Sequence, residues 1–149
     1  MSDVQKKNLT TDELLKILHS VNSVSKLNEY TELLPENTSY HSFSEYFFAY
    51  LQTHNLVESE IIHASLIQRN YAYQILNGTK KPGRDKVLAL CLAAHMTYEE
   101  TQRALALAEC GKLYPRRKKD SIIIFALENG LTVQQTNELL YEEGVNVLE

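Results

Sequence analysis

The stretch QRNYAYQILNGTKKPGRDK, residues 68–86, decides the fold predicted for this chain. Its first half has the spacing of a short helix, because Ala72, Ile75 and Leu76 recur at i, i+3 and i+4 and form one apolar face. Glycine readily adopts the left-handed conformation that closes a helix, so the Asn-Gly pair at 77–78 should end this one. Polar side chains occupy the rest of the helix and its N-terminal end. They are Gln68, Arg69, Asn70, Tyr73 and Asn77.

Helical signals continue on both sides of this stretch. Four capping boxes, each a Ser or Thr followed three residues later by Glu or Gln, precede stretches of helical periodicity. No segment alternates apolar and polar residues over the length of a half-buried strand. We therefore expect an all-α fold. The four boxes are Thr10–Glu13, Ser42–Glu45, Thr97–Glu100 and Thr132–Gln135.

The expected helices fall into three groups along the chain. A first helix covers about residues 11–33 and should break near SVNSVS, residues 20–25, where Ser and Asn side chains compete for backbone hydrogen bonds. The segment LPENTSYH, residues 34–41, indicates a linker because it carries a proline. Five helices follow, at about 43–54, 58–64, 68–76, 83–95 and 98–108, and a final pair covers about 117–128 and 133–142. The predicted divisions are 1–41, 42–110 and 111–149.

The composition indicates a globular protein rather than a membrane or secreted one. The N-terminal sequence MSDVQKKNLTTDE is polar and lacks the apolar core of a signal peptide. The longest apolar runs, VLALCLAAHM and SIIIFAL, fall well short of the roughly 20 residues that a membrane span needs. We therefore expect a cytoplasmic protein with no membrane contact.

No cluster of reactive residues suggests a metal site, a cofactor or an enzyme. Cys91 and Cys110 lack the Cys/His spacing of a zinc site, and the five histidines show no metal-ligand spacing. Phosphate-binding loops, nucleophile elbows and HExxH sequences are missing from the chain. We therefore predict no cofactor, no metal and no enzymatic activity.

Charge is unevenly distributed along the chain, whose net charge is −4. Residues 66–119 contain eleven Lys or Arg and four Asp or Glu, a net charge of +7, so the remainder carries −11. A basic segment in an acidic chain can present a local face for phosphate groups, although the chain as a whole should not bind nucleic acid indiscriminately. The short helices at 58–64 and 68–76, joined by a tight turn, have the arrangement of a helix-turn-helix, whose second helix can enter the major groove of DNA.

The polar residues of the second helix fit this role. Arg69 can bond the edge of a guanine and Asn70 the edge of an adenine. The Tyr73 ring can contact a thymine methyl group, or its hydroxyl can contact a phosphate. Tyr71 is expected to pack against the helix at 83–95. The predicted base-reading residues are Gln68, Arg69, Asn70 and Tyr73, and the predicted phosphate-binding residues are Asn77, Lys80, Lys81 and Arg84.

Residues 59–105, from SEIIHASL to TQRAL, resemble the helix-turn-helix domain of phage-repressor/Cro-type (XRE-type) regulators. NYAYQILNGTKKPGRDKVLAL, residues 70–90, is similar to a bacterial subgroup whose recognition helix has the pattern Y-x-Y-Q-I-x-x-G. The likeness covers about residues 43–148. It implies a lambda-repressor-like five-helix core, with an added N-terminal helix and a C-terminal helix pair, that binds double-stranded DNA as a transcriptional regulator.

The chain departs from this family pattern at three positions. Ile62 stands where many members have a small residue, and Leu66 stands in the turn where they have Gly. Leu66 fits only if the turn does not need a positive φ there. Glu58 replaces a Gln that often helps to hold a phosphate, and a carboxylate would repel that phosphate.

Two further questions stay open at the level of sequence. The run RRKK, Arg116, Arg117, Lys118 and Lys119, is a candidate second patch for an anionic partner, because positive charge is unfavourable at a helix N-terminus. A homodimer is expected, and its interface could be the apolar face of the N-terminal helix or the C-terminal helix pair. The alternative function is a protein-interaction module of the same fold, antitoxin-like or docking a kinase or effector, with little or no DNA binding.

Overall fold

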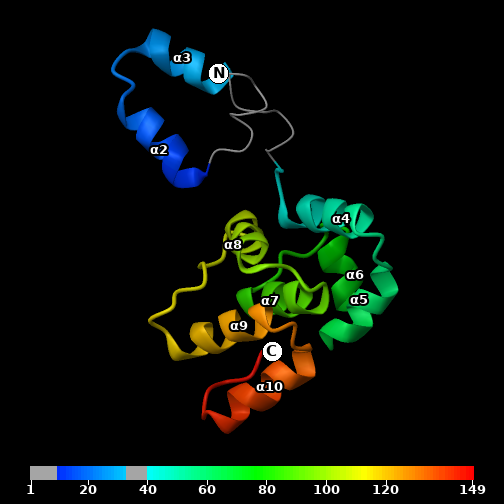
Figure 1. Ribbon diagram of the computed structural model, residues 1–149. Coiled ribbons are helices and arrows are strands. Elements are labelled where there is room, and N and C mark those ends of the chain that lie inside the picture. Colours follow the sequence, from blue (N-terminus) through cyan, green and yellow to red (C-terminus); the bar gives the residue numbers. More distant parts are fainter. Residues whose placement is uncertain (1–9, 33–39) are drawn as a thin grey trace. The chain divides into compact units, whose positions relative to one another are not determined.

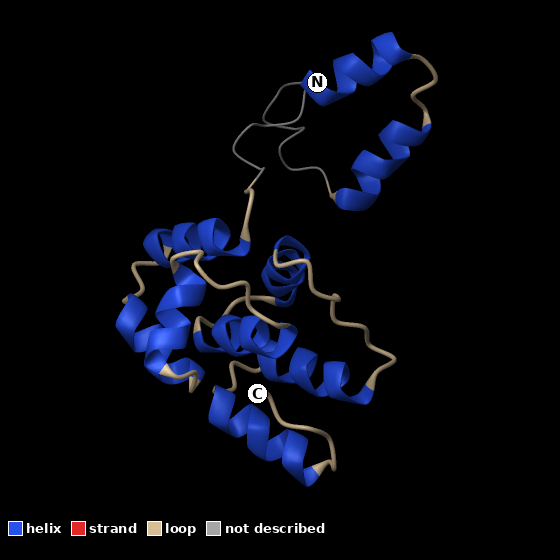
Figure 2. Ribbon diagram, turned by 180° about the vertical axis from the view of Figure 1, so that it is seen from behind, coloured by secondary structure: helices blue, strands red, loops and turns tan. Residues whose placement is uncertain are grey.

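The computed structural model describes residues 10–32 and 40–149, and every regular element in these two ranges is an α-helix (Figures 1 and 2). The predicted all-α fold is therefore confirmed. Most of the predicted linker at 34–41 lies outside the described residues. The chain separates into two compact units, Met1–Tyr40 and His41–Glu149.

The described part of the N-terminal unit contains two short helices, α2 (Thr11–His19) and α3 (Val24–Glu32). The predicted break near residues 20–25 is confirmed, and serine side chains make it. The Ser20 hydroxyl donates a hydrogen bond to the Ile17 carbonyl at 2.6 Å, which ends α2. The Ser23 hydroxyl accepts one from the Lys26 amide at 3.2 Å, which opens α3. These are the local side-chain bonds by which serine competes with a continuous helix.

The second unit contains seven helices, and six of them surround the seventh, α7. The bounds are α4 (Phe43–Thr53), α5 (Glu58–Ser65), α6 (Arg69–Leu76), α7 (Arg84–Ala93), α8 (Tyr98–Leu107), α9 (Lys118–Glu128) and α10 (Val133–Glu142). Helix α7 lies in the middle and packs against α5, α8 and α10 (Figure 1). Helix α4 packs on α6 and α8, and α9 packs on α8 and α10. The C-terminal helices therefore cover one side of the same core.

Helix α7 is central because it is apolar on all sides beyond its charged first turn. All seven residues from Val87 to Ala93 are buried, as expected of a helix with no polar stripe. Cys91 in this helix is fully buried, and burial raises the pKa of its thiol to about 12, so it packs as a small neutral side chain. Around it the neighbouring helices contribute buried side chains such as Phe47, Ile75 and Leu105.

The predicted capping boxes differ in whether both of their reciprocal hydrogen bonds form. At Thr97–Glu100 and Thr132–Gln135 both reciprocal bonds form, so these boxes are complete. At Ser42 the hydroxyl accepts from the Glu45 amide, but the Glu45 carboxylate accepts from the amide of His41 rather than that of Ser42. The prediction of a full box is therefore wrong at this position, because the carboxylate reaches one residue further back.

Each helix of the second unit ends in a residue with positive φ. Glycine or asparagine fills four of these positions, at Asn55, Gly78, Gly130 and Gly144, and Leu66, His95 and Glu109 fill the others. The left-handed residue turns the chain so that amides beyond the helix bond back to its last carbonyls, as Met96 does to Cys91 at 3.0 Å. Six of the seven helix ends are thus fixed by the backbone itself, whereas at the end of α5 the Ile67 amide bonds the Ser65 hydroxyl.

Leu66 shows that one expectation from the sequence is wrong. The turn after α5 does require a positive φ, and Leu66 adopts it at 62°. Its side chain is 59% exposed, so little burial offsets the strain of a leucine in this conformation. Leu66 therefore sits where glycine would be relaxed.

Replacing Leu66 should separate backbone strain from side-chain packing. We expect Leu66→Gly to have a free energy of unfolding about 1 kcal/mol above that of Leu66→Ala, because alanine keeps the left-handed strain and glycine removes it. Both variants lose the same exposed side chain, so alanine is the matched control. Chemical denaturation of both proteins measures the difference, and equal stabilities would show that the turn is not strained.

Candidate nucleic-acid interface

Helices α5 and α6 are joined by a turn of three residues, Leu66, Ile67 and Gln68. The buried Ser65 hydroxyl holds this turn, because it donates to the Ile62 carbonyl at 2.7 Å and accepts from the Ile67 amide at 3.2 Å. Ile67 is itself buried. The angle between the two short helices is therefore set by internal contacts, and α6 is presented as a rigid element.

Helix α6 divides into an inner and an outer face, much as its sequence predicts. Ala72 and Ile75 are fully buried, whereas Leu76, predicted to lie in the core, is only half-buried. The outer face carries Arg69 and Asn70, both exposed, in the first turn of the helix.

Two predicted contact residues also close the ends of α6. The Gln68 side-chain oxygen accepts from the Tyr71 amide at 2.8 Å and caps the helix. The Asn77 side-chain oxygen accepts from the Thr79 amide at 2.9 Å, just beyond the last turn. The side-chain amide nitrogens of Gln68 and Asn77 remain as donors. Both side chains thus keep part of their hydrogen-bonding capacity for a ligand.

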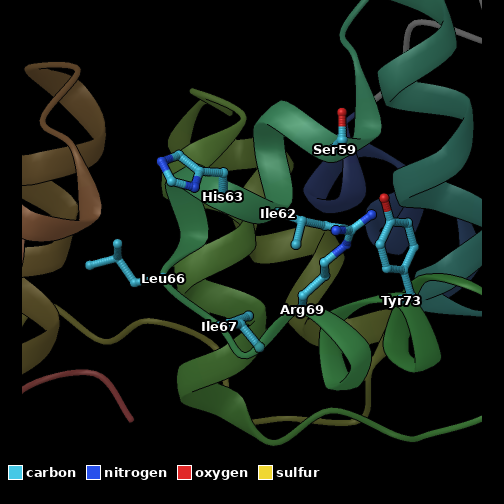
Figure 3. A pocket seen from close by; sticks show the side chains of 7 residues that line it. All are labelled: Ser59, Ile62, His63, Leu66, Ile67, Arg69 and Tyr73. Carbon is cyan, nitrogen blue, oxygen red and sulfur yellow. The ribbon is translucent and has the colours of Figure 1, made fainter.

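A groove of about 450 Å³ lies between α5 and α6 (Figure 3). Its aliphatic lining residues are Ile62, Leu66 and Ile67. At its α6 edge the Arg69 guanidinium lies 5.7 Å from the centre of the Tyr73 ring, within the range of a cation–π contact. The two side chains lie next to each other in Figure 3, with the hydroxyl of Ser59 above them. Tyr73 is half-buried rather than fully exposed.

On the other side of α6, a lysine of α7 that was not among the predicted site residues lies against the helix. Tyr71 faces α7, as predicted, and the Lys86 ammonium lies 5.8 Å from the centre of its ring. Lys86 was missed because Arg84, two residues earlier, offered the more obvious phosphate contact. The helical spacing could have indicated Lys86, because residues two apart on a helix point to opposite sides and Lys86 therefore faces away from Arg84.

Arg84, predicted to bind a phosphate, instead binds groups of the protein itself. Its guanidinium forms a bidentate pair with the Asp120 carboxylate at 2.9 and 3.0 Å and donates to the carbonyls of Gly111 and Lys112. Four of its five N–H groups are therefore used inside the protein. Asp120 is 1% exposed and also accepts from the Tyr114 amide at 2.9 Å. This arrangement ties α7 to α9 and leaves Arg84 little capacity for a phosphate.

The two lysines after α6 differ in their surroundings. Lys80 is exposed and forms no ion pair among the described residues. Lys81 bonds Glu109 at 2.9 Å. That hydrogen bond raises the pKa of Lys81 and lowers the pKa of Glu109, so both groups stay charged near neutral pH. The pair is exposed and easily exchanged for another partner.

Half of the basic run at 116–119 is neutralised by carboxylates of the same unit. Lys118 lies 3.6 Å from the Glu143 carboxylate and donates to the Glu143 carbonyl at 2.8 Å. Lys119 lies 3.3 Å from Asp85. Arg116 and Arg117 are exposed and form no ion pair among the described residues. The candidate second patch therefore reduces to these two arginines.

The N-terminus of α5 is occupied by negative charge. Its N-cap, Val57, offers no side-chain bond, and Glu58 and Glu60 lie in the first turn. Carboxylates are favourable at this end of a helix dipole, so they stabilise α5 without a capping side chain. The same charges would repel a phosphate brought to this end of the helix.

The described part of the chain shows neither a metal-binding cluster nor a helix that could span a membrane. Within residues 10–32 and 40–149, no group of three or more His, Cys, Asp or Glu is placed to hold a metal ion. Each helix in those ranges is too short or too polar to cross a bilayer. Comparison with protein-family models, curated proteins and solved structures finds no match to this chain. A function for it therefore rests on its own residues and their geometry.

Removing Asp120 should cost far more stability than removing an exposed partner. We expect Asp120→Ala to lower the free energy of unfolding by about 3 kcal/mol, because Arg84 is left with its charge unpaired. Lys118→Ala is the matched control, since it breaks an exposed ion pair on the same helix and should change stability much less. Denaturant unfolding of the two variants gives the comparison.

A double variant tests whether charge or packing is responsible. Arg84→Met combined with Asp120→Leu should recover much of the lost stability, because no buried charge then lacks a partner. If the double variant were as unstable as Asp120→Ala alone, the unpaired guanidinium would not be the cause.

Proposed function

We propose that this protein is a cytoplasmic, sequence-specific regulator that binds double-stranded DNA through a helix-turn-helix formed by α5 and α6. In this proposal α6 enters the major groove and binding, not catalysis, is the function. The protein acts as a homodimer, which lets two copies read two half-sites and multiplies specificity.

One observation carries the proposal. The outer face of α6 presents an arginine and an asparagine in its first turn, and both are exposed, while the opposite face is anchored in the core. The first turn of a recognition helix is the part that reaches base edges. Arg69 can donate two parallel bonds to guanine, and Asn70 can both donate to and accept from adenine. Gln68 and Tyr73 flank them.

Lys80, Lys81 and Asn77 support the proposal from the loop that follows α6. Their donors lie just beyond the helix, where contacts to the sugar–phosphate backbone would fix its register without reading sequence. Lys81 would exchange Glu109 for a phosphate, which is feasible because the pair is exposed. Arg84 is left out of this set because its guanidinium is held by Asp120.

The second candidate function is a protein-interaction module of the same fold. It is favoured by the carboxylates of Glu58 and Glu60 at the start of α5, where a phosphate contact would otherwise be expected. The ion pairs of Lys81, Lys118 and Lys119 also reduce the basic character of the surface. Purification at low salt separates the two: a stable protein partner with no retained DNA supports the second candidate.

The Arg69→Ala/Asn70→Ala double variant tests DNA binding directly. Genomic fragments are first selected by the unaltered protein, and the tightest is used in an anisotropy titration over a range of salt concentrations. We expect the double variant to lose affinity for the selected fragment, with Arg69→Ala alone costing about 1–3 kcal/mol and relaxing specificity at one base pair.

Lys112→Ala is the matched control, because it removes one exposed cation from the α8–α9 loop and leaves α6 intact. It should retain the sequence preference of the unaltered protein. Unchanged affinity and preference in the Arg69→Ala/Asn70→Ala protein would refute α6 as the reading element.

A further inference from the structure

The two tyrosines of the Tyr-Ala-Tyr run in α6 each lie against one cation. Tyr73 contacts the Arg69 guanidinium, with 5.7 Å between the guanidinium carbon and the ring centre. Tyr71 contacts the ammonium of Lys86 from α7, with 5.8 Å between nitrogen and ring centre. Both distances fall within the range of an attractive cation–π contact. Each ring is half-buried, so it is anchored on one side while its face is available to the cation.

The helix places these two pairs on opposite sides of its outer face. Residues two apart on an α-helix are separated by about 200°, so the rings of Tyr71 and Tyr73 point away from each other. The Arg69–Tyr73 pair lies at the edge of the groove with α5. The Lys86–Tyr71 pair lies on the side of α7. Asn70 is exposed between them.

We propose that the Tyr-Ala-Tyr run is a positioning device that holds Arg69 toward a base edge and Lys86 toward the sugar–phosphate backbone. This inference rests on the DNA-binding function proposed above. It assigns Tyr73 an indirect role, through Arg69, in place of direct contact with a thymine methyl or a phosphate. It also adds Lys86 to the DNA-facing cations.

Arginine and lysine side chains are flexible, and fixing them costs conformational entropy when a ligand binds. A ring that already holds the cation in the free protein lowers this cost, which is the benefit of preorganisation. The benefit differs for the two cations. A fixed guanidinium matches the edge of a guanine and affects sequence preference, whereas a fixed ammonium affects attraction to any phosphate.

The test uses paired substitutions in the full chain. Tyr73→Phe and Tyr71→Phe keep the ring face and remove only the hydroxyl, whereas Tyr73→Leu and Tyr71→Leu remove the ring and keep an apolar side chain. Affinities are measured on the duplex selected by the unaltered protein and on variants of it with single base-pair changes. Helical content and thermal midpoint of each protein show that it is folded.

For Tyr73, we expect the leucine variant to lose roughly two- to fivefold of the discrimination at the base pair that Arg69→Ala affects. The phenylalanine variant should retain it. In an Arg69→Ala background, Tyr73→Leu should have no further effect on that base pair, because the ring acts through the guanidinium.

For Tyr71, the leucine variant should weaken binding to all duplexes by roughly two- to fivefold without changing their order. Lys86→Ala should weaken all of them as well and reduce the slope of log affinity against log salt by about 0.9, the value for one lost phosphate contact.

Several outcomes would overturn the inference while leaving DNA binding intact. One is a Tyr73→Phe protein that binds as poorly as Tyr73→Leu, which would assign the contact to the hydroxyl. Others are a Tyr73→Leu protein with full discrimination and a Lys86→Ala protein with an unchanged salt slope. If the unaltered protein selects no duplex at all, the proposed function itself fails, and this result is distinguishable from the others. A Tyr→Leu variant that does not fold leaves the phenylalanine and Lys86→Ala measurements to decide.

Discussion

The bidentate ion pair between Arg84 and Asp120 is the contact on which the second unit depends. It joins the first turn of the central helix to the first turn of α9, and the buried carboxylate accepts a third bond from the Tyr114 amide. Beside it, Asp85 and Lys119 form a second pair in the opposite sense. Arg84 and Asp85 are neighbours on α7, and their partners Asp120 and Lys119 are neighbours on α9. The two ion pairs together therefore fix the register of the two helices as well as the distance between them.

This contact also shapes the surface at which the proposed DNA interface lies. By taking the guanidinium of Arg84 inward, Asp120 leaves Lys86 as the cation of α7 that lies against α6. The proposed binding surface is therefore small and centred on α6, and acidic groups at the start of α5 limit its extent. A surface of this kind favours specific contacts over general attraction to phosphate, in keeping with the negative net charge of the chain.

The sequence predicted much of the fold, because helix signals are local. Local hydrogen bonds form the caps at Thr97 and Thr132 and the serine break between α2 and α3. Each of these bonds joins residues no more than four apart, so the patterns could be interpreted without knowing the fold. The candidate site was less predictable. Nothing local to Arg84 reveals a carboxylate 36 residues away, and it was taken for a phosphate ligand. Leu66 was misjudged for a similar reason, since only the path of the chain required its positive φ.

The left-handed residues at the helix ends affect how the backbone exchanges its amide hydrogens. At an ordinary helix end the last turn frays, and amides just beyond it exchange quickly with water. In this protein the amides of Met96, Cys110 and Val145 bond back to carbonyls at 3.0, 2.8 and 2.9 Å, respectively. Protection from exchange should therefore extend past the helices into the loops. Slow exchange in these loops would reflect local closure of the chain, and would not by itself indicate a bound ligand or a buried interface.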